Sequence, residues 1–231
     1  NNSGKTMLLK ILIGLIPVNK CILVNRTFLE DLSPLQKKNR LQVLFENKPL
    51  FKGRTYQEVL MLSLLPFDYE KEVIEEKIKS ISKELNLGKE SKKDPNSFTF
   101  FEKKKLELAS CLINEPEILL IDDVFKYFKE EEKEEFVSYL QNYQEKGGTL
   151  IIATLDLSLS LLFKEPIIHF LHKGKIVKSS SLPAIFEDDS LISKIGLTLP
   201  FIVDLSVKLK YYNMVDKICY EKEWLVDEIW K

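Results

Sequence analysis

The stretch "EILLIDD", residues 117–123, decides the fold. Its unbroken apolar run is typical of a central parallel strand that is covered on both faces. A helical pattern over residues 102–114 precedes this strand, and another over residues 129–147 leads into a second buried-strand run, "TLIIAT", at residues 149–154. Helices that alternate with buried strands predict an α/β fold with a parallel sheet.

The N-terminal part of the chain continues the same alternation. Residues 7–16 are mostly apolar, which predicts a helix that is buried on several sides and that Pro17 closes. Short β-rich segments follow at residues 21–24 and 42–45, and Ser33, which precedes a proline, marks a helix start between them. We expect both segments to form strands.

Two further segments define the domain organisation. Residues 55–87 have the apolar spacing of a helix, which we expect Gly88 to stop. Residues 166–177 are typical of a β-hairpin with its turn at Lys173-Gly174. We therefore predict three parts: a core domain over residues 1–185, a helical subdomain inserted at about residues 52–114, and a helical C-terminal extension over residues 186–231.

Composition limits the class of protein. The 231 residues include 34 Lys and Arg against 35 Asp and Glu, and a formal charge of -1 gives no bulk field that would attract nucleic acid. No apolar run approaches the roughly 20 residues of a membrane-crossing helix. The three cysteines lie far apart in apolar runs, which favours buried thiols in the cytoplasm over a disulfide framework. The missing initiator methionine suggests a trimmed or partial chain.

The opening "NNSGKT", residues 1–6, is half of a phosphate-binding pattern. Such a loop needs a second glycine followed by Lys and Ser or Thr. Main-chain N–H groups surround the phosphate oxygens, the lysine neutralises charge, and the hydroxyl binds Mg²⁺. The helix that begins at once would point its N-terminal dipole at the same anion. The alternative is a polar turn before an ordinary helix. The candidate nucleotide-binding residues are Asn1, Asn2, Ser3, Gly4, Lys5 and Thr6.

A second half-motif ends the strand that decides the fold. Asp122 lies at the carboxyl end of this strand, where an α/β sheet binds its ligands, and one such carboxylate holds Mg²⁺ through water. Thr6 and Asp122 are therefore the candidate metal ligands. Asp123, beside it, is positioned to orient or polarise an attacking water. The alternative interpretation is a strand that simply ends in a polar turn.

At this point the sequence resembles a known family. The ordered segments that carry the resemblance are "NNSGKTMLLKILIGL", "VLFENKPLF", "SFTFFEKKKLELASCLINEPEILLIDD", "GGTLIIATLDLSLSLLF" and "IIHFLHKGKIV". In order and spacing they resemble the ATP-binding-cassette (ABC) ATPase subunits of membrane transporters, over nearly the whole chain. The resemblance implies a P-loop NTPase core with an inserted helical subdomain, and ATP and Mg²⁺ as cofactors.

The C-terminal segment makes the family resemblance more specific. "LISKIGLTLP", residues 191–200, resembles the C-terminal extension of the energy-coupling-factor, cobalt-type importer branch. This resemblance implies a peripheral subunit on the inner face of the cell membrane that couples ATP binding and hydrolysis to transport of a vitamin or metal ion. Its implied partners are a second ABC ATPase subunit, with a heterodimer favoured, and a transmembrane subunit. Residues 47–67 lie where the family docks that subunit, although ordinary core packing has the same spacing.

The chain departs from the family at the residues that hydrolyse ATP. Glu46 stands in place of the glutamine that contacts metal and attacking water. Asp123 stands in place of a glutamate and is one methylene shorter, and a base misplaced by an ångström costs on the order of a hundredfold in rate. Leu155 replaces the switch histidine. The resemblance thus implies Asp123 and Glu46 as catalytic residues with impaired turnover.

The signature segment also departs from the family. Residues Phe98, Thr99, Phe100, Phe101 and Glu102 replace Leu-Ser-Gly-Gly-Gln, which in the family opens a helix that caps the γ-phosphate of ATP held by the partner. Phenylalanine in place of glycine prevents close approach of the backbone to phosphate. We expect Phe100-Phe101 to pack within its own domain, and Lys103 to Lys105 to form a solvated face. The alternatives to a slow enzyme are a non-catalytic nucleotide-binding or scaffolding partner, and a decaying gene product.

Overall fold

The computed structural model describes residues 3–47, 51–52, 55–87, 94–186, 192 and 196–231. The chain forms two compact units. The larger unit is Lys5–Ala153, and the smaller unit combines Thr154–Lys231 with the N-terminal residues up to Gly4. The predicted domain boundaries at residues 185 and 186 stay a prediction. Each unit is described by itself below.

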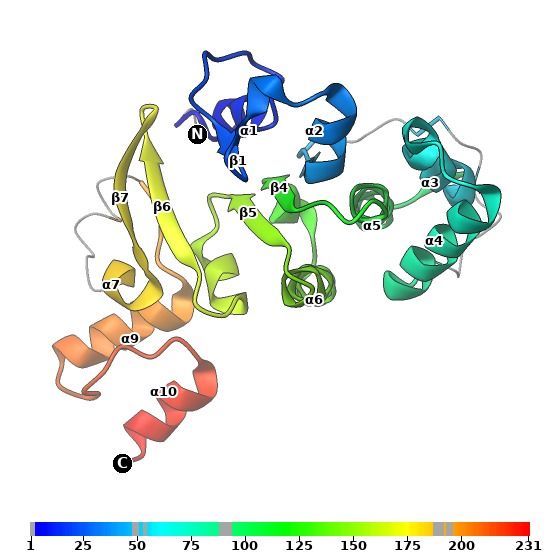
Figure 1. Ribbon diagram of the computed structural model, residues 1–231. Helices are drawn as coiled ribbons and strands as arrows, with labels where there is room; N and C mark the ends of the chain where they lie inside the picture. Colours follow the sequence, from blue (N-terminus) through cyan, green and yellow to red (C-terminus); the bar gives the residue numbers. More distant parts are fainter. Residues whose placement is uncertain (1–2, 48–50, 53–54, 88–93, 187–191, 193–195) are drawn as a thin grey trace. The chain divides into compact units, whose positions relative to one another are not determined.

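A three-stranded parallel sheet forms the centre of the larger unit (Figure 1). Its strands are β3 (Leu41–Leu44), β4 (Ile118–Asp122) and β5 (Thr149–Ala153), in the order β3-β4-β5. Leu44 lies opposite Ile121, and Asp122 lies opposite Ala153. The predicted α/β class with a parallel sheet is therefore confirmed.

Strands β4 and β5 differ in burial although their sequences are equally apolar. Leu119, Leu120 and Ile121 of β4 are fully buried, as predicted. Ile151 of β5 is 40% exposed, so the prediction of a second buried strand is wrong. The reason is position in the sheet: within the described part of the larger unit, β5 pairs with β4 alone and leaves its other edge unpaired.

Helices flank this sheet. α5 (Phe100–Leu112) and α2 (Pro34–Arg40) pack against β3, α1 (Lys5–Leu12) packs against β4, and α6 (Glu130–Glu145) packs against β5. Ser33 accepts from the Gln36 N–H and completes a capping box with Pro34 in the first turn, which confirms the predicted helix start. A small hairpin of β1 (Leu23–Val24) and β2 (Thr27–Phe28) precedes α2. Cys21 is exposed in the irregular segment before it, so its predicted burial is wrong.

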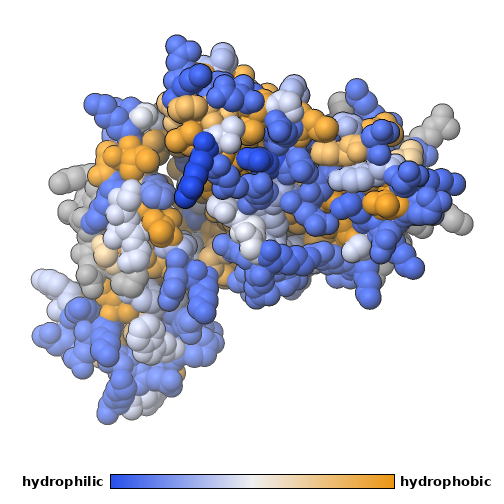
Figure 2. Space-filling model, in the orientation of Figure 1, coloured by the Kyte–Doolittle hydropathy of each residue, from blue (hydrophilic) through white to orange (hydrophobic). Residues whose placement is uncertain are grey.

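Helix α1 ends earlier than predicted. Gly14 adopts a left-handed conformation (φ +78°), its N–H donates to the Ile11 carbonyl, and the Leu15 N–H donates to the Lys10 carbonyl. This is a Schellman cap, so glycine and not Pro17 terminates the helix. The helix also buries one residue alone, Leu9, whereas Met7 is 61% exposed. The prediction of a helix buried on several sides is therefore wrong, and Figure 2 shows apolar side chains at the surface around α1.

The segment predicted as one helical region contains two α-helices. α3 (Tyr56–Leu64) and α4 (Lys71–Glu84) pack against each other and against α5. Pro66 and the left-handed Asp68 (φ +51°) separate them, because neither residue suits a helix interior. Asn86 (φ +50°) takes the left-handed position that ends α4, two residues before the predicted stop at Gly88, which lies outside the described residues.

The smaller unit contains a hairpin and a set of helices. β6 (Ile167–His172) and β7 (Lys175–Ser181) pair antiparallel, and the turn residues Lys173 (φ +48°) and Gly174 (φ +75°) have the signs of a type I′ turn. The predicted hairpin is therefore confirmed. Three α-helices follow in the described part of this unit: α7 (Leu182–Phe186), α9 (Phe201–Tyr211) and α10 (Lys222–Ile229). A core of this unit's own residues gathers Phe170, Ile185 and Val203.

Candidate functional site

The carboxyl ends of β3 and β4 bring the two predicted catalytic residues to the same level. Leu44 and Ile121 are paired across the parallel ladder, and Glu46 and Asp123 each lie two residues after their member of that pair. Because neighbouring parallel strands run in register, both loops leave the same edge of the sheet. This edge is where open α/β sheets bind ligands.

Asp122 and Asp123 have different environments. Asp122 is the last residue of β4 and its side chain is buried. Asp123 has a left-handed backbone (φ +49°), and its N–H donates to the Ala153 carbonyl at 2.8 Å. The hydrogen bond continues the β4–β5 ladder by one residue, and the left-handed turn then redirects the chain. One carboxylate therefore stays at the strand end while the next residue leaves the sheet.

Glu46 is held by a cation from the segment that follows Asp123. Its carboxylate is 3.5 Å from the ammonium of Lys126, which lies in the 3₁₀ turn η5 (Val124–Tyr127). Tyr127 and Glu46 raise the pKa of Lys126, so the lysine keeps its charge. Both side chains of this pair are about half exposed. The pair links the loops after β3 and β4 at the edge where the candidate site lies.

In the N-terminal loop, Gly4 adopts a left-handed backbone conformation that glycine favours. Gly4 has a φ of +98°, and a Cβ at this position would lie 3.8 Å from the Cα of Gly174, an ordinary van der Waals distance. The Ser3 carbonyl accepts from the Gly174 N–H at 3.0 Å, which places the hairpin turn beside the loop. Lys5 and Thr6 open α1, which packs against β4. Asn1 and Asn2 lie outside the described residues.

The oxygen donors of Thr6 and Asp122 are of the kind that fits Mg²⁺. Thr6 supplies a hydroxyl and Asp122 a buried carboxylate, which are hard ligands. Magnesium is usually held by one or two carboxylates together with substrate phosphates and water, and not by a cage of protein ligands. The described residues contain no group of three or more His, Cys, Asp or Glu side chains that could hold a metal ion.

The N-terminus of α5 caps itself. The Thr99 hydroxyl accepts from the Glu102 N–H at 3.2 Å, and the Glu102 carboxylate accepts from the Thr99 N–H at 2.7 Å. This capping box satisfies two of the helix's N-terminal donors and places a carboxylate beside them. Phosphate is attracted to helix N-termini with free donors, so the arrangement opposes binding of an anion at this point.

The two phenylalanines of the signature segment pack within their own unit. The Phe100 ring meets the Tyr127 ring edge to face with centroids 5.2 Å apart, and Phe101 meets Phe128 in the same way at 5.2 Å. Phe98 and Phe101 are buried. The predicted packing of Phe100-Phe101 is confirmed, because the aromatic cluster joins the start of α5 to η5 and the residue after it.

The prediction of a solvated lysine face on α5 is wrong for Lys104 and Lys105. Lys104 is completely buried, and the ammonium of Lys105 is 3.1 Å from the Glu135 carboxylate with its side chain 12% exposed. The reason is that α5 packs against β3 on one side and against α3 and α4 on others. Lys104 recurs with Leu108 and Cys111 at helical spacing, which places the three on one face of α5 but does not show that this face is buried.

Sequence reasoning missed three charged residues near this edge, which are Lys104, Glu107 and Lys126. The i, i+3 spacing of Lys104 and Glu107 indicates a pair, but nothing in the sequence shows that the pair is buried. Leu155 lies two residues after β5 and belongs to the smaller unit. That Leu155 occupies the position of the family's switch histidine stays a prediction.

Comparisons with known proteins show which proteins the chain is similar to. A "Putative ABC transporter ATP-binding protein" from onion yellows phytoplasma is 30% identical over 91% of the chain, and the chain spans 36% of that protein. An "Energy-coupling factor transporter ATP-binding protein EcfA" from Malacoplasma penetrans is 26% identical, covering 100% of the chain and 81% of that protein. Solved CbiO1 from Clostridium perfringens, described as part of the ABC transporter complex CbiONQ, has a TM-score of 0.73 at 20% identity, with 89% of the chain and 84% of that structure covered.

A family model provides the last comparison. The model described as "ABC transporter" matches residues 1–126, more than half of the 231 residues. The match spans the N-terminal loop, β3, the signature segment and β4, together with Asp122 at the end of β4 and Asp123 after it. These parts form the candidate site. The chain therefore belongs to the ABC transporter family.

Proposed function

We propose that the chain is the ATP-binding subunit of an energy-coupling-factor importer and couples ATP binding and hydrolysis to transport of a vitamin or metal ion. In this proposal Gly4, Lys5 and Thr6 hold the phosphates, with Asn1, Asn2 and Ser3 completing the loop. Asp122 and Thr6 hold Mg²⁺, and Asp123 with Glu46 orients the attacking water. The similarity to proteins named EcfA supports the importer class.

One observation carries this proposal. Helix α1, whose first residues are Lys5 and Thr6, packs directly on β4, the strand that ends in the buried carboxylate of Asp122. The proposed phosphate-binding residues and the proposed metal-binding carboxylate thus belong to α1 and β4, two elements in contact. Bound Mg²⁺ would neutralise charge on the phosphates and act as a Lewis acid. The chain's own contribution is the ammonium of Lys5, the N-terminal donors of α1 and the fixed carboxylate.

We expect slow turnover because each group that would act on water is altered. Asp123 is a shorter base, Glu46 adds negative charge beside the phosphates, and Leu155 cannot contact a γ-phosphate. The ion pair between Glu46 and Lys126 supports a role for Glu46 in place of glutamine, because the cation offsets the added charge. A base displaced by an ångström costs on the order of a hundredfold in rate.

We propose that the chain acts in a heterodimer with a second cassette. In a two-cassette sandwich the start of α5 would face the partner's nucleotide, and here that helix start is closed by its own capping box and by the Phe100-Phe101 packing. A homodimer would repeat this defect at both nucleotide sites. A partner with an intact signature would restore one of them.

The proposed membrane partner docks on residues 47–67, and the subunit lies on the inner face of the cell membrane. No helix among the described residues has the length and apolar content to cross a membrane. In α3, Tyr56, Leu60 and Leu64 are buried while Met61 and Leu62 are exposed. A hollow of about 360 Å³ opens between α3 and α4, lined by Tyr56, Gln57, Glu75, Ile78, Lys79 and Ser82.

Equilibrium binding tests the nucleotide site. We expect Mg²⁺-ATP to bind the purified chain and to bind at least tenfold more weakly to Lys5→Ala, because the ammonium neutralises phosphate charge. Lys20→Ala is the matched control, since this lysine lies outside the proposed site and we expect it to bind as the unaltered chain does. Equal binding by the Lys5 and Lys20 variants would contradict the proposed phosphate loop.

The second candidate function is a non-catalytic scaffold, and the self-capped α5 favours it. The combined variant Asp123→Glu with Leu155→His separates the two candidates. A rise in steady-state ATP hydrolysis of tenfold or more shows a damaged enzyme. Unchanged hydrolysis, with ATP binding intact, shows a chain that holds nucleotide and supports its partner.

A further inference from the structure

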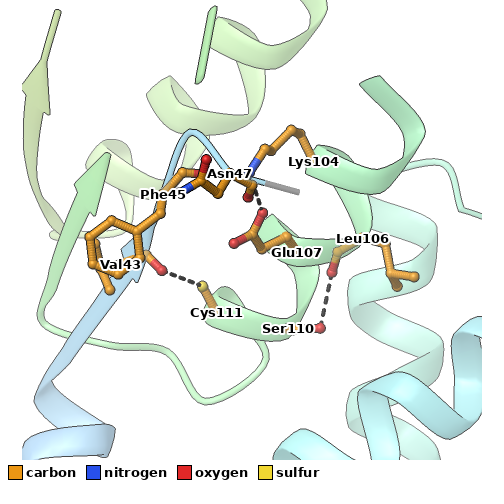
Figure 3. Close-up of polar contacts among 8 residues, drawn as sticks. All are labelled: Val43, Phe45, Asn47, Lys104, Leu106, Glu107, Ser110 and Cys111. Carbon is orange, nitrogen blue, oxygen red and sulfur yellow. Dashed lines mark hydrogen bonds and ion pairs between the residues drawn. The ribbon is translucent and has the colours of Figure 1, made fainter. Parts of the chain in front are cut away.

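The side chain of Lys104 is the most deeply buried cation in the described part of the chain. It reaches from α5 to the loop after β3, and Figure 3 shows it directed toward Phe45 and Asn47. Its ammonium donates to the Phe45 carbonyl, to the Asn47 carbonyl at 3.1 Å and to the Glu107 carboxylate at 2.7 Å. All three donors of the ammonium are thereby used.

Glu107 binds the same ammonium. Its carboxylate accepts from Lys104, whose ammonium also donates to the Phe45 carbonyl, so one charged pair holds the main chain at Phe45. Burial raises the pKa of Glu107, and the charge and hydrogen bond of Lys104 offset only part of this rise. One turn further along α5, the Cys111 thiol lies 3.8 Å from the Val43 carbonyl of β3. The contacts therefore continue from the strand into the loop.

This pair is poorly explained by stability alone. Burying two charges costs several kcal/mol, and a buried ion pair is often no more stabilising than apolar packing of the same volume. What Lys104 binds instead is the main chain on both sides of Glu46, since its acceptors are the carbonyls of the residues before and after. Lys126 holds the carboxylate of Glu46 itself at 3.5 Å.

We propose that Lys104, with Glu107, is a positioning residue that fixes the loop carrying Glu46 at the edge of the sheet where Asp123 emerges. The inference rests on the proposed function, in which Glu46 orients water. It adds that the start of α5 and the water-orienting loop move together, because the Lys104 ammonium also lies 5.7 Å from the centroid of the Phe100 ring. A shift of α5 is then transmitted to Glu46 through the lysine.

Single-turnover hydrolysis of Mg²⁺-ATP by the full chain tests this inference. Lys104→Met keeps the length of the side chain and removes the charge, and we expect the hydrolysis rate to fall about tenfold while the ATP dissociation constant changes less than threefold. Lys105→Met is the matched control, since its ammonium binds Glu135 and not the loop. We expect the control to hydrolyse ATP at the unaltered rate. An unchanged rate in Lys104→Met overturns the inference.

A double-mutant cycle separates positioning from a merely structural role. In a Glu46→Ala background, Lys104→Met should cause no further loss of rate, because the residue that it positions is gone. A loss as large as in the unaltered background overturns the inference. Where Lys104→Met alone fails to fold, Lys104→Met with Glu107→Leu removes both buried charges together and should show the same loss of rate and the same dependence on Glu46.

Amide hydrogen exchange tests whether Lys104 fixes the loop without requiring that the chain hydrolyses ATP. Without nucleotide, amide exchange of residues 45–47 should be at least tenfold faster in Lys104→Met than in Lys105→Met. Where the unaltered chain hydrolyses no ATP, the proposed enzymatic function fails, and exchange alone decides whether Lys104 fixes the loop. Equal exchange in both variants overturns the inference.

Discussion

At the scale of single residues, Tyr143 couples the stability of the larger unit to alkaline pH. Its hydroxyl donates to the Pro116 carbonyl at 2.8 Å, and its side chain is buried. Burial, and secondly the charge of Glu117, raise the pKa of Tyr143 to about 12. The folded protein therefore keeps a proton that the unfolded chain releases near pH 10, so this contribution to stability is lost as the pH rises from about 10 to about 12.

The variant Tyr143→Phe tests this coupling. At pH 7 we expect the free energy of unfolding to fall by about 1 kcal/mol, because a buried hydrogen bond is lost. Between pH 10 and pH 12 this deficit should shrink, since phenylalanine has no proton to lose. Urea unfolding at a series of pH values measures both effects. Tyr211→Phe, on an exposed tyrosine, is the control; a deficit for Tyr143→Phe that stays constant with pH would contradict the assignment.

The residues of the candidate site differ in how far sequence could predict them. The positions of Asp122 and Asp123 could be predicted from one apolar run, because a covered strand that ends in acidic residues places them where the strands of the sheet end. Lys104 could not be assigned in this way, since three consecutive lysines on a helix indicate solvent unless the packing partners are known. Its burial depends on the loop after β3, whose contacts with α5 no local pattern encodes.

At the scale of elements, the capping box of α5 gives a second prediction. Thr99→Ala removes the hydroxyl that accepts from the Glu102 N–H, and we expect a loss of about 1 kcal/mol in the free energy of unfolding. Ser33→Ala removes the matching cap of α2 and should cost a similar amount. Thermal and urea unfolding of both variants measure these losses. Full stability of Thr99→Ala would show that the box does not hold the helix start.

The elements themselves were largely predictable, and the exceptions have physical causes. The hairpin turn at Lys173-Gly174 follows from local chemistry alone, because two residues with positive φ suit a tight turn. The end of α1 was misplaced since a glycine with a Schellman cap stops a helix before any proline does. The burial of β5 was overestimated because an apolar strand at a sheet edge has the same sequence as one at the centre.

At the scale of the whole molecule, each of the two compact units has its own core. Leu157, Phe170, Ile185, Phe186, Ile192 and Val203 form one buried cluster, and all of them belong to the smaller unit. Val24, Leu29, Leu32 and Leu41 form another within the larger unit. Residue periodicity predicts which side chains enter a core. It does not predict which core they enter, so the division at residues 153 and 154 was not evident from the sequence.

Separate cores imply that the smaller unit can open without the larger one. Ile185→Ala removes a fully buried side chain, and we expect the smaller unit to lose about 2–5 kcal/mol of stability. Native-state hydrogen exchange should then accelerate in α9 while β4 keeps its protection, because stability varies between cooperative regions of a protein. The control is Ile176→Ala on the exposed face of β7, which should change stability by less than about 0.5 kcal/mol. Equal acceleration in α9 and β4 would show instead that the chain unfolds as one cooperative body.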